Sequence, residues 1–204
     1  MITRYREYLE FLDKKLAKMF EAQKTFIKCK KGCAYCCREG EYPLSELEYI
    51  NMMLYYNELP DDLKTRVDDN IINLLKKARE KMYECPFLVD GICSVYPARG
   101  IICRTFGLIS FDEKEKKRIP FCVNLNLNYS EVYDTETQTL LGNAKDGSEP
   151  LAYNINRKFL RGSKVEKEFD IFFGEDKPLV EWLAQEDFIT VSYTHLTLPT
   201  ILLV

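Results

Sequence analysis

The sequence predicts an α+β fold that is mainly helical, with short β-hairpins in one domain. Apolar side chains recur at helical spacing through residues 1–84, and the pair Asp90-Gly91 separates two short apolar runs. The chain has 204 residues, of which 46% are hydrophobic and 30% charged, so it is long and apolar enough to bury one core. Eight cysteines fall mostly between the periodic segments, and we expect these cysteine-rich loops to converge.

Two helices are predicted before Pro60. The first covers about 3–26, where one apolar stripe recurs every three or four residues. Its members are Tyr5, Leu9, Leu12, Leu16, Met19 and Phe20. The second covers about 46–58, because Ser45 and Glu48 have the spacing of a capping box, in which each side chain pairs with a free backbone amide of the other residue.

The strongest helical period begins after Pro60, which restarts the chain. Its apolar members are Leu63, Val67, Ile71, Leu74, Leu75, Ala78 and Met82. Stripes of this kind form the core of a domain, so we assign them no chemical role.

Hairpins and short helices are predicted in the rest of the chain. Asp90-Gly91 favours a type I′ turn between 87–89 and 92–95. A second hairpin pairs 105–111 with 118–123 across the charged run DEKEKKR, which we expect to be a solvated loop tip. The polar segment 124–148 is assigned little structure. Helices are expected near 150–161 and 178–186, the latter with Pro178 in its first turn.

Charge and hydropathy exclude several classes of protein. Lys and Arg number 29 against 32 Asp and Glu, a net charge of −3, which does not suit a general nucleic-acid binder. The N-terminus lacks the apolar run of a secretory signal, and no stretch is apolar enough to span a membrane. We therefore expect a cytoplasmic, prokaryotic protein with reduced thiols and with no nucleic-acid or membrane partner. A disulfide framework is the alternative use of eight cysteines.

The C-terminal residues do not look like part of a natural protein. Residues 191–200, VSYTHLTLPT, resemble a translated sequencing adapter. On that resemblance, a single cysteine-cluster domain covers 1–190, and 191–204 is a non-native tail. The only histidine, His195, lies in this tail, so we expect a site that works without imidazole.

The first cysteine group is dense. Cys29, Cys33, Cys36 and Cys37 lie within nine residues. The two-residue gap between Cys33 and Cys36 lets one turn direct two sulfurs at one metal, as in structural zinc and iron–sulfur sites. Cys37 follows Cys36 directly, so both can serve one centre only in irregular backbone; otherwise Cys37 serves a second metal or none.

The second group is more widely spaced, with Cys85, Cys93, Cys103 and finally Cys122. Four thiolates around a metal centre leave negative charge, which nearby guanidiniums offset. We therefore predict that Arg99 and Arg104 contact the cofactor, and the alternative is that both are ordinary surface arginines. Cys122 lies in an apolar stretch of sequence, so it is either a buried structural thiol or a metal ligand.

The ordered pattern resembles a known family. The run C29-x3-C33-x2-C36-C37, followed by C85-P-F-L-x2-G-x-C93-x2-Y96-x2-R99-x3-C103-R104, is similar to the YkgJ-type cysteine cluster family, the CxxCxxCC zinc- or iron-chelating domain also found in flagellin lysine N-methylases. The matching residues span about 29–104. The resemblance implies a zinc or iron–sulfur centre. The chain departs from the family at Gly100, where Pro is usual after the Arg.

An iron–sulfur cluster, with [4Fe–4S] favoured, is the expected cofactor, and Zn²⁺ is the alternative. Zinc fingers usually show two close Cys/His pairs, whereas here the later spacings are long and all ligands are cysteines. The predicted role is electron transfer, sensing or structural support. Two alternatives are a protein-lysine methylase-related enzyme and a zinc-stabilised interaction module, although the chain has no G-x-G-x-x-G methyl-donor motif.

Overall fold

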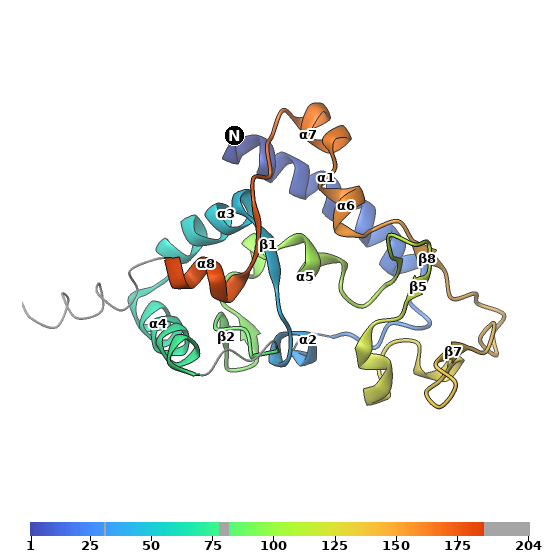
Figure 1. The fold of residues 1–204 in the computed structure, drawn as a ribbon. Coiled ribbons are helices and arrows are strands. Elements are labelled where there is room, and N and C mark those ends of the chain that lie inside the picture. Colours follow the sequence, from blue (N-terminus) through green and yellow to red (C-terminus); the bar gives the residue numbers. More distant parts are fainter. Residues whose placement is uncertain (31, 78–81, 186–204) are drawn as a thin grey trace, which may run out of the picture.

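The computed structural model describes residues 1–30, 32–77 and 82–185. It confirms the α+β class: helices of varied length are combined with several two- or three-stranded sheets (Figure 1). The predicted tail, 191–204, and His195 lie outside the described residues. Within the described residues, no helix is both long enough and apolar enough to cross a bilayer.

The three predicted N-terminal helices are present. They are α1 (Ile2–Ala22), α3 (Glu46–Asn57) and α4 (Asp61–Lys76). The capping box of α3 is complete: Ser45 Oγ accepts from the Glu48 amide at 3.3 Å, and the Glu48 carboxylate accepts from the Ser45 amide at 2.9 Å. The predicted extension of the third helix to Met82 is wrong, because α4 ends at Lys76 and Met82 lies in an exposed bend. Ala78 lies outside the described residues.

The Asp90-Gly91 hairpin is confirmed, in short form. Strands β2 (Leu88–Val89) and β3 (Ile92–Cys93) pair antiparallel. Asp90 and Gly91 have φ values of 53° and 74°, both left-handed as a type I′ turn requires. This geometry places Cys93 opposite Leu88 in the register.

The second hairpin is much shorter than predicted. Only β4 (Ile109–Phe111) and β5 (Lys117–Arg118) pair, because α5 (Ile101–Thr105) and the 3₁₀ turn η2 (Phe121–Leu125) take up the flanking residues. Strand β8 (Ala152–Tyr153) adds to β4 in parallel.

The C-terminal part corrects two predictions. Residues expected to begin a helix at 150 instead form β8, and only α6 (Arg157–Leu160) is helical. Pro178 is the last residue of β9 (Asp176–Pro178) rather than part of the first turn of α8 (Leu179–Gln185). Strand β9 pairs antiparallel with β1 (Pro43–Ser45), so the C-terminal part of the described chain joins the segment before α3. The remaining elements are α2 (Tyr35–Arg38), η1 (Tyr96–Ala98), η3 (Ser130–Val132), β6 (Tyr133–Asp134), β7 (Thr139–Leu140) and α7 (Ser163–Phe169).

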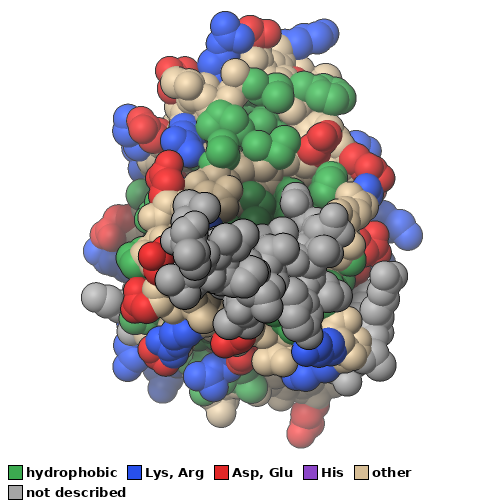
Figure 2. Space-filling view, turned by 90° about the vertical axis from the view of Figure 1, so that its left-hand side faces the viewer, with side chains coloured by type: hydrophobic (Ala, Val, Ile, Leu, Met, Phe, Trp, Pro, Cys, Tyr) green, Lys and Arg blue, Asp and Glu red, His purple; other side chains and the backbone are tan. Residues whose placement is uncertain are grey.

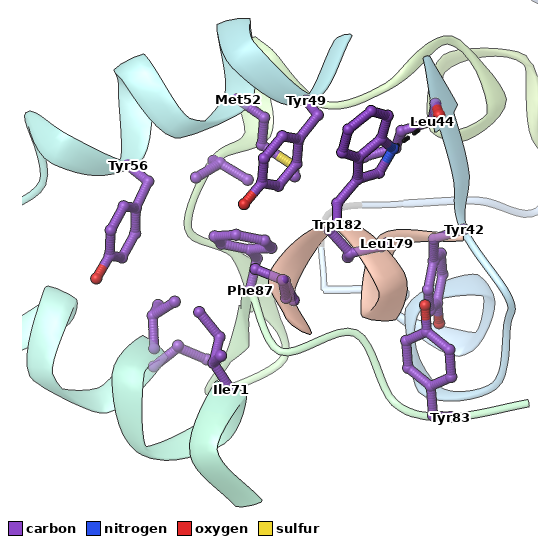
Figure 3. Close-up of a cluster of buried hydrophobic side chains, with 14 residues drawn as sticks. Tyr42, Leu44, Tyr49, Met52, Tyr56, Ile71, Tyr83, Phe87, Leu179 and Trp182 are labelled. Carbon is purple, nitrogen blue, oxygen red and sulfur yellow. Dashed lines mark hydrogen bonds between the residues drawn. The ribbon is translucent and has the colours of Figure 1, made fainter. Parts of the chain in front are cut away.

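Helix α3 is shared by two hydrophobic cores. The first core packs α3 and α4 against α8 and the β2–β3 hairpin, and Figure 3 shows its aromatic side chains. Trp182 stacks on Tyr49 there, with ring centroids 5.3 Å apart, and donates its indole N–H to the Leu44 carbonyl at 3.0 Å. The second core joins α1, α5 and the α6–α7 segment, and Leu47 of α3 is part of it. On the face that Figure 2 shows, described charges of both signs are interspersed around an apolar group.

A buried carboxylate lies between these two cores. Glu48 is 1% exposed and accepts hydrogen bonds from four groups. They are the Ser45 amide at 2.9 Å, the Ser45 hydroxyl at 2.8 Å, the Ile101 amide at 2.7 Å and Arg161 Nη1 at 2.7 Å. Arg161 also pairs with Asp176 of β9. The carboxylate thereby ties α3 to the first residue of α5 and to β9.

Replacing Glu48 should therefore destabilise the whole domain. Glu48→Ala leaves the buried Arg161 guanidinium and the Ile101 amide without this partner, and we expect a loss of about 3–5 kcal/mol in the free energy of unfolding. Urea denaturation of the metal-free protein measures it. The matched Glu10→Ala change, at an exposed position of α1, should stay within about 0.5 kcal/mol. Equal losses in the two variants would refute the role of the buried carboxylate.

Candidate metal centre

The eight cysteines are all free thiols, carried by loops and short elements. Cys122 is buried, Cys29 is exposed, and the other six are half-buried. The chain places them before α2, within α2, around the β2–β3 hairpin, in α5 and in η2. Segments far apart in the sequence come together here: α2 and β2 lie near each other at the bottom of Figure 1, and the amide of Cys85 donates to the carbonyl of Cys37 at 2.8 Å.

Four thiols influence one another directly: Cys36, Cys85, Cys93 and Cys103. Burial raises the pKa of Cys85, and the nearby thiolates of Cys103 and Cys93 raise it further. Burial also raises the pKa of Cys103 to about 12, with Cys93 and Cys36 adding to the effect. The pKa of Cys93 is raised by burial and, among its neighbours, by Cys36. We call these four cysteines the quartet.

The sequence predicts that adjacent Cys36 and Cys37 can serve one centre only in irregular backbone. In the structure both lie in one helical turn, α2. Their sulfurs are nevertheless 3.9 Å apart. The hydrogen bond with Cys37 raises the pKa of Cys36 far above its ordinary value, and burial adds to the rise. A short helix therefore presents both sulfurs to the same region.

The other three cysteines, Cys29, Cys33 and Cys122, form a second group beside the quartet. Burial raises the pKa of Cys122 to about 11, and the charges of Cys29 and Cys33 add to the rise. Burial raises the pKa of Cys29 as well, although the hydrogen bond from Asn128 opposes it. Cys36 acts on Cys29 and on Cys122, so it links this group to the quartet.

Asn128 supports the second group, and sequence reasoning missed it. The side chain is fully buried, donates from Nδ2 to the Cys29 sulfur at 3.2 Å and to the Gly107 carbonyl at 3.0 Å, and accepts from the Lys28 amide at 2.8 Å. Gly107 has a φ of 104°, and a Cβ atom there would lie 2.9 Å from Asn128 Nδ2. An asparagine in a polar segment gives no signal in the sequence, because its role arises only from contacts with distant residues.

Backbone amides also hydrogen-bond to three of the sulfurs. The amides of Phe87, Val95 and Asn128 hydrogen-bond to the cysteines at 85, 93 and 122, respectively, and partly offset the burial that raises the pKa of each thiol. Donors of this kind stabilise thiolate ligands and tune a metal centre.

The two predicted arginines have different surroundings. Arg99 lies over the Tyr96 ring at 3.9 Å and donates to the Tyr96 carbonyl at 2.8 Å. Its charge also opposes the burial that raises the pKa values of Cys93 and Cys103, which places it near the quartet. Arg104 is buried and donates to Asp13 at 2.5 Å and to the carbonyls of residues 97 and 99 at 2.5 and 3.0 Å. Its contact with a cofactor stays a prediction.

The donor set fits a thiophilic metal centre. Thiolate sulfur is a preferred ligand of zinc and of iron–sulfur clusters, and three separate segments of the chain supply eight free thiols. Among residues 1–30, 32–77 and 82–185, however, no three Cys, His, Asp or Glu side chains are already close enough to hold an ion. Metal binding would therefore have to draw the sulfurs together and to displace protons from thiols whose pKa values are raised.

Comparison with known proteins finds a family model that matches the cysteine-rich part of the chain. Residues 28–123 match the family described as "CxxCxxCC: Putative zinc- or iron-chelating domain". This match confirms the resemblance seen in the sequence and is consistent with the YkgJ family name. The match extends beyond Cys103 to include Cys122. No curated protein and no solved structure matches the chain.

Substituting the two arginines separately should distinguish a structural role from an electrostatic one. Arg104→Ala removes a buried guanidinium that holds two loop carbonyls, so we expect the free energy of unfolding of the metal-free protein to fall by about 3 kcal/mol. Arg99→Ala, at the more accessible position, should cost less than about 1 kcal/mol. Urea denaturation of both variants tests this, and a larger loss for Arg99→Ala would show that the assignment is reversed.

The raised thiol pKa values also predict how the stability of the reduced, metal-free protein depends on pH. In the unfolded chain the thiols ionise near their ordinary pKa of 9.0, whereas in the folded chain Cys122 and Cys103 hold their protons to about 11 and about 12. The folded state therefore binds more protons above pH 9, and stability should fall as pH rises through this window. Melting temperatures from about pH 8 to about pH 10.5 measure the effect.

A variant that lacks both thiols, Cys103→Ala with Cys122→Ala, serves as the control. It should show a flatter fall of melting temperature with pH, because two of the groups that titrate differently in the folded and unfolded states are gone. An identical slope in the variant and the parent would refute the explanation.

Proposed function

We propose that this protein holds an all-cysteine iron–sulfur centre, of the [4Fe–4S] type, that serves in electron transfer or sensing or supports the structure. The observation that carries the proposal is that the cysteine-bearing segments meet: the Cys85 amide donates to the Cys37 carbonyl at 2.8 Å, and the four thiols of the quartet act on one another's ionisation. Four cysteine ligands are what such a cluster requires. The family match supports chelation of zinc or iron.

The quartet supplies the first set of ligands. The other four thiols, Cys29, Cys33, Cys37 and Cys122, lie beside it and are numerous enough for a second centre. All eight are therefore proposed as metal ligands. The number of metal atoms bound per chain counts the centres.

Three features of the site favour iron–sulfur over zinc. The candidate donors are all sulfurs. Zinc fingers usually have two close pairs of ligands, whereas here only Cys33 and Cys36 are separated by two residues. Arg99 lies near the quartet, where it offsets the negative charge that four thiolates leave on a cluster. Backbone amides donate to several sulfurs, a means by which proteins set cluster potentials.

The residues of this chain would bind and shield the cluster. When bound, an iron–sulfur cluster supplies one-electron transfer. The thiols would lose their protons and become ligands, Arg99 would balance charge, and the half-buried setting of the quartet would limit access of water. Eight reduced cysteines suit a reducing compartment, and we propose the cytoplasm as the location.

Anaerobic purification tests the proposal. We expect brown protein with a broad absorbance near about 400 nm and with iron and acid-labile sulfide in equal amounts. Cys93→Ser should lose most of the iron, whereas the neighbouring change Ser94→Ala, which removes only a hydrogen bond to the Phe87 carbonyl, should retain it. Colourless protein that carries zinc by elemental analysis would overturn the iron–sulfur assignment, and protein without any metal would overturn the function.

A further inference from the structure

The hydroxyl of Tyr42 is buried without a hydrogen-bond partner. The side chain is 7% exposed, and the structure, over the residues it describes, gives its oxygen no donor or acceptor. A buried hydroxyl without a partner destabilises a fold, so native proteins rarely leave one unpaired. The position therefore calls for a ligand that the polypeptide itself does not supply.

The backbone around Tyr42 fixes the direction of the ring. A Cβ atom on Gly40 would lie 2.7 Å from the Tyr42 ring and 3.0 Å from its hydroxyl, so the phenol packs directly over this glycine. Gly40 in turn exchanges two backbone hydrogen bonds with Tyr83, both at 3.1 Å. The rings of Tyr42 and Tyr83 meet edge to face with centroids 5.4 Å apart, as Figure 3 shows.

The strained backbone of Tyr42 is a second sign of function. Its φ of 49° lies in the left-handed region, which a bulky residue rarely adopts. The conformation is held because Leu179 donates its amide to the Tyr42 carbonyl at 3.0 Å and β1 pairs with β9 from the next residue. Strain of this kind persists where the surrounding structure over-determines it, often at binding sites.

The segments that carry Cys37 and Cys85 are joined by backbone hydrogen bonds at Gly40, over which the phenol packs. Cys85 and Cys93 pack against the core cluster that contains Tyr42, and the amide of Cys85 is bonded to the carbonyl of Cys37. Burial raises the pKa of Tyr42 far above its ordinary value, and the thiolates of Cys85 and Cys37 are the next largest contributors. The neighbouring Tyr83 differs, since its hydroxyl already donates to the Glu41 carbonyl at 2.8 Å and accepts from the Val180 amide at 3.1 Å.

We propose that the Tyr42 hydroxyl donates a hydrogen bond to a metal-bound sulfur of the centre built from Cys85 and its neighbours. Tyr42 is then a positioning residue that stabilises the bound thiolate and, in an iron–sulfur cluster, raises its reduction potential. The inference rests on the proposed metal centre. It predicts opposite effects on the two forms of the protein, because the hydroxyl lacks a partner only when no metal is bound.

The test compares Tyr42→Phe with Tyr153→Phe. Tyr153 also has a buried hydroxyl without a partner in the described structure, but no thiolate contributes to the rise in its pKa, which burial alone causes. Each variant is purified anaerobically, loaded with iron and sulfide, and challenged with a chelator while metal release is followed. The melting temperature of each metal-free form and the midpoint potential of each loaded form are also measured.

The expected result is specific to position 42. Tyr42→Phe should weaken metal retention by about 10-fold or more and should make the midpoint potential more negative, whereas its metal-free form should melt no lower than wild type. Tyr153→Phe should leave retention and potential unchanged. If the wild-type protein binds metal and Tyr42→Phe changes neither retention nor potential, this inference is overturned. It is also overturned if Tyr153→Phe changes them equally, and in both cases the proposed function stands. A wild-type protein that binds no metal would overturn the proposed function, and this inference with it.

Discussion

The buried carboxylate of Glu48 is the interaction on which the arrangement of the domain depends. It accepts from the start of α3, from the first amide of α5 and from Arg161, which also reaches β9. Removing a carboxylate from water is costly, and four donors offset that cost only in one arrangement of these segments. Because α5 carries Cys103, the same carboxylate that joins the two cores also sets the position of one of the quartet sulfurs.

The arrangement that Glu48 stabilises holds the cysteine-bearing loops, which have little apolar content of their own. The segment 28–37 is tied by Asn128 on one side and by the amide of Cys85 on the other. Thiols from distant stretches are thereby kept near one another as protonated groups, since burial raises the pKa values of most of them. A metal that replaces those protons would still have to draw the sulfurs together, but the segments that carry Cys37 and Cys85 are already in contact, so the cost of ordering the loops is reduced.

Much of the fold could be predicted where the local signal was strong. The amphipathic stripes predicted α1 and most of α4, the capping box of Ser45 and Glu48 predicted α3, and the pair Asp90-Gly91 predicted its hairpin, because these signals act within a few residues. The helix expected from 150 was wrong because Ala152 and Tyr153 pair with β4, a contact with a segment some forty residues away. The pairing of β1 with β9 was missed for the same reason.

The sequence by itself determined which donors the proposed centre is built from: eight cysteines stand in an ordered spacing, and the histidine lies in a segment outside the described residues. Only the tertiary structure decided which sulfurs are neighbours, that Arg104 holds a loop while Arg99 lies near the thiols, and that Asn128 and Tyr42 accompany them. The physical reason is that a ligand type is a property of one residue, whereas a shared centre depends on hydrogen bonds and burial that bring together residues far apart in the chain.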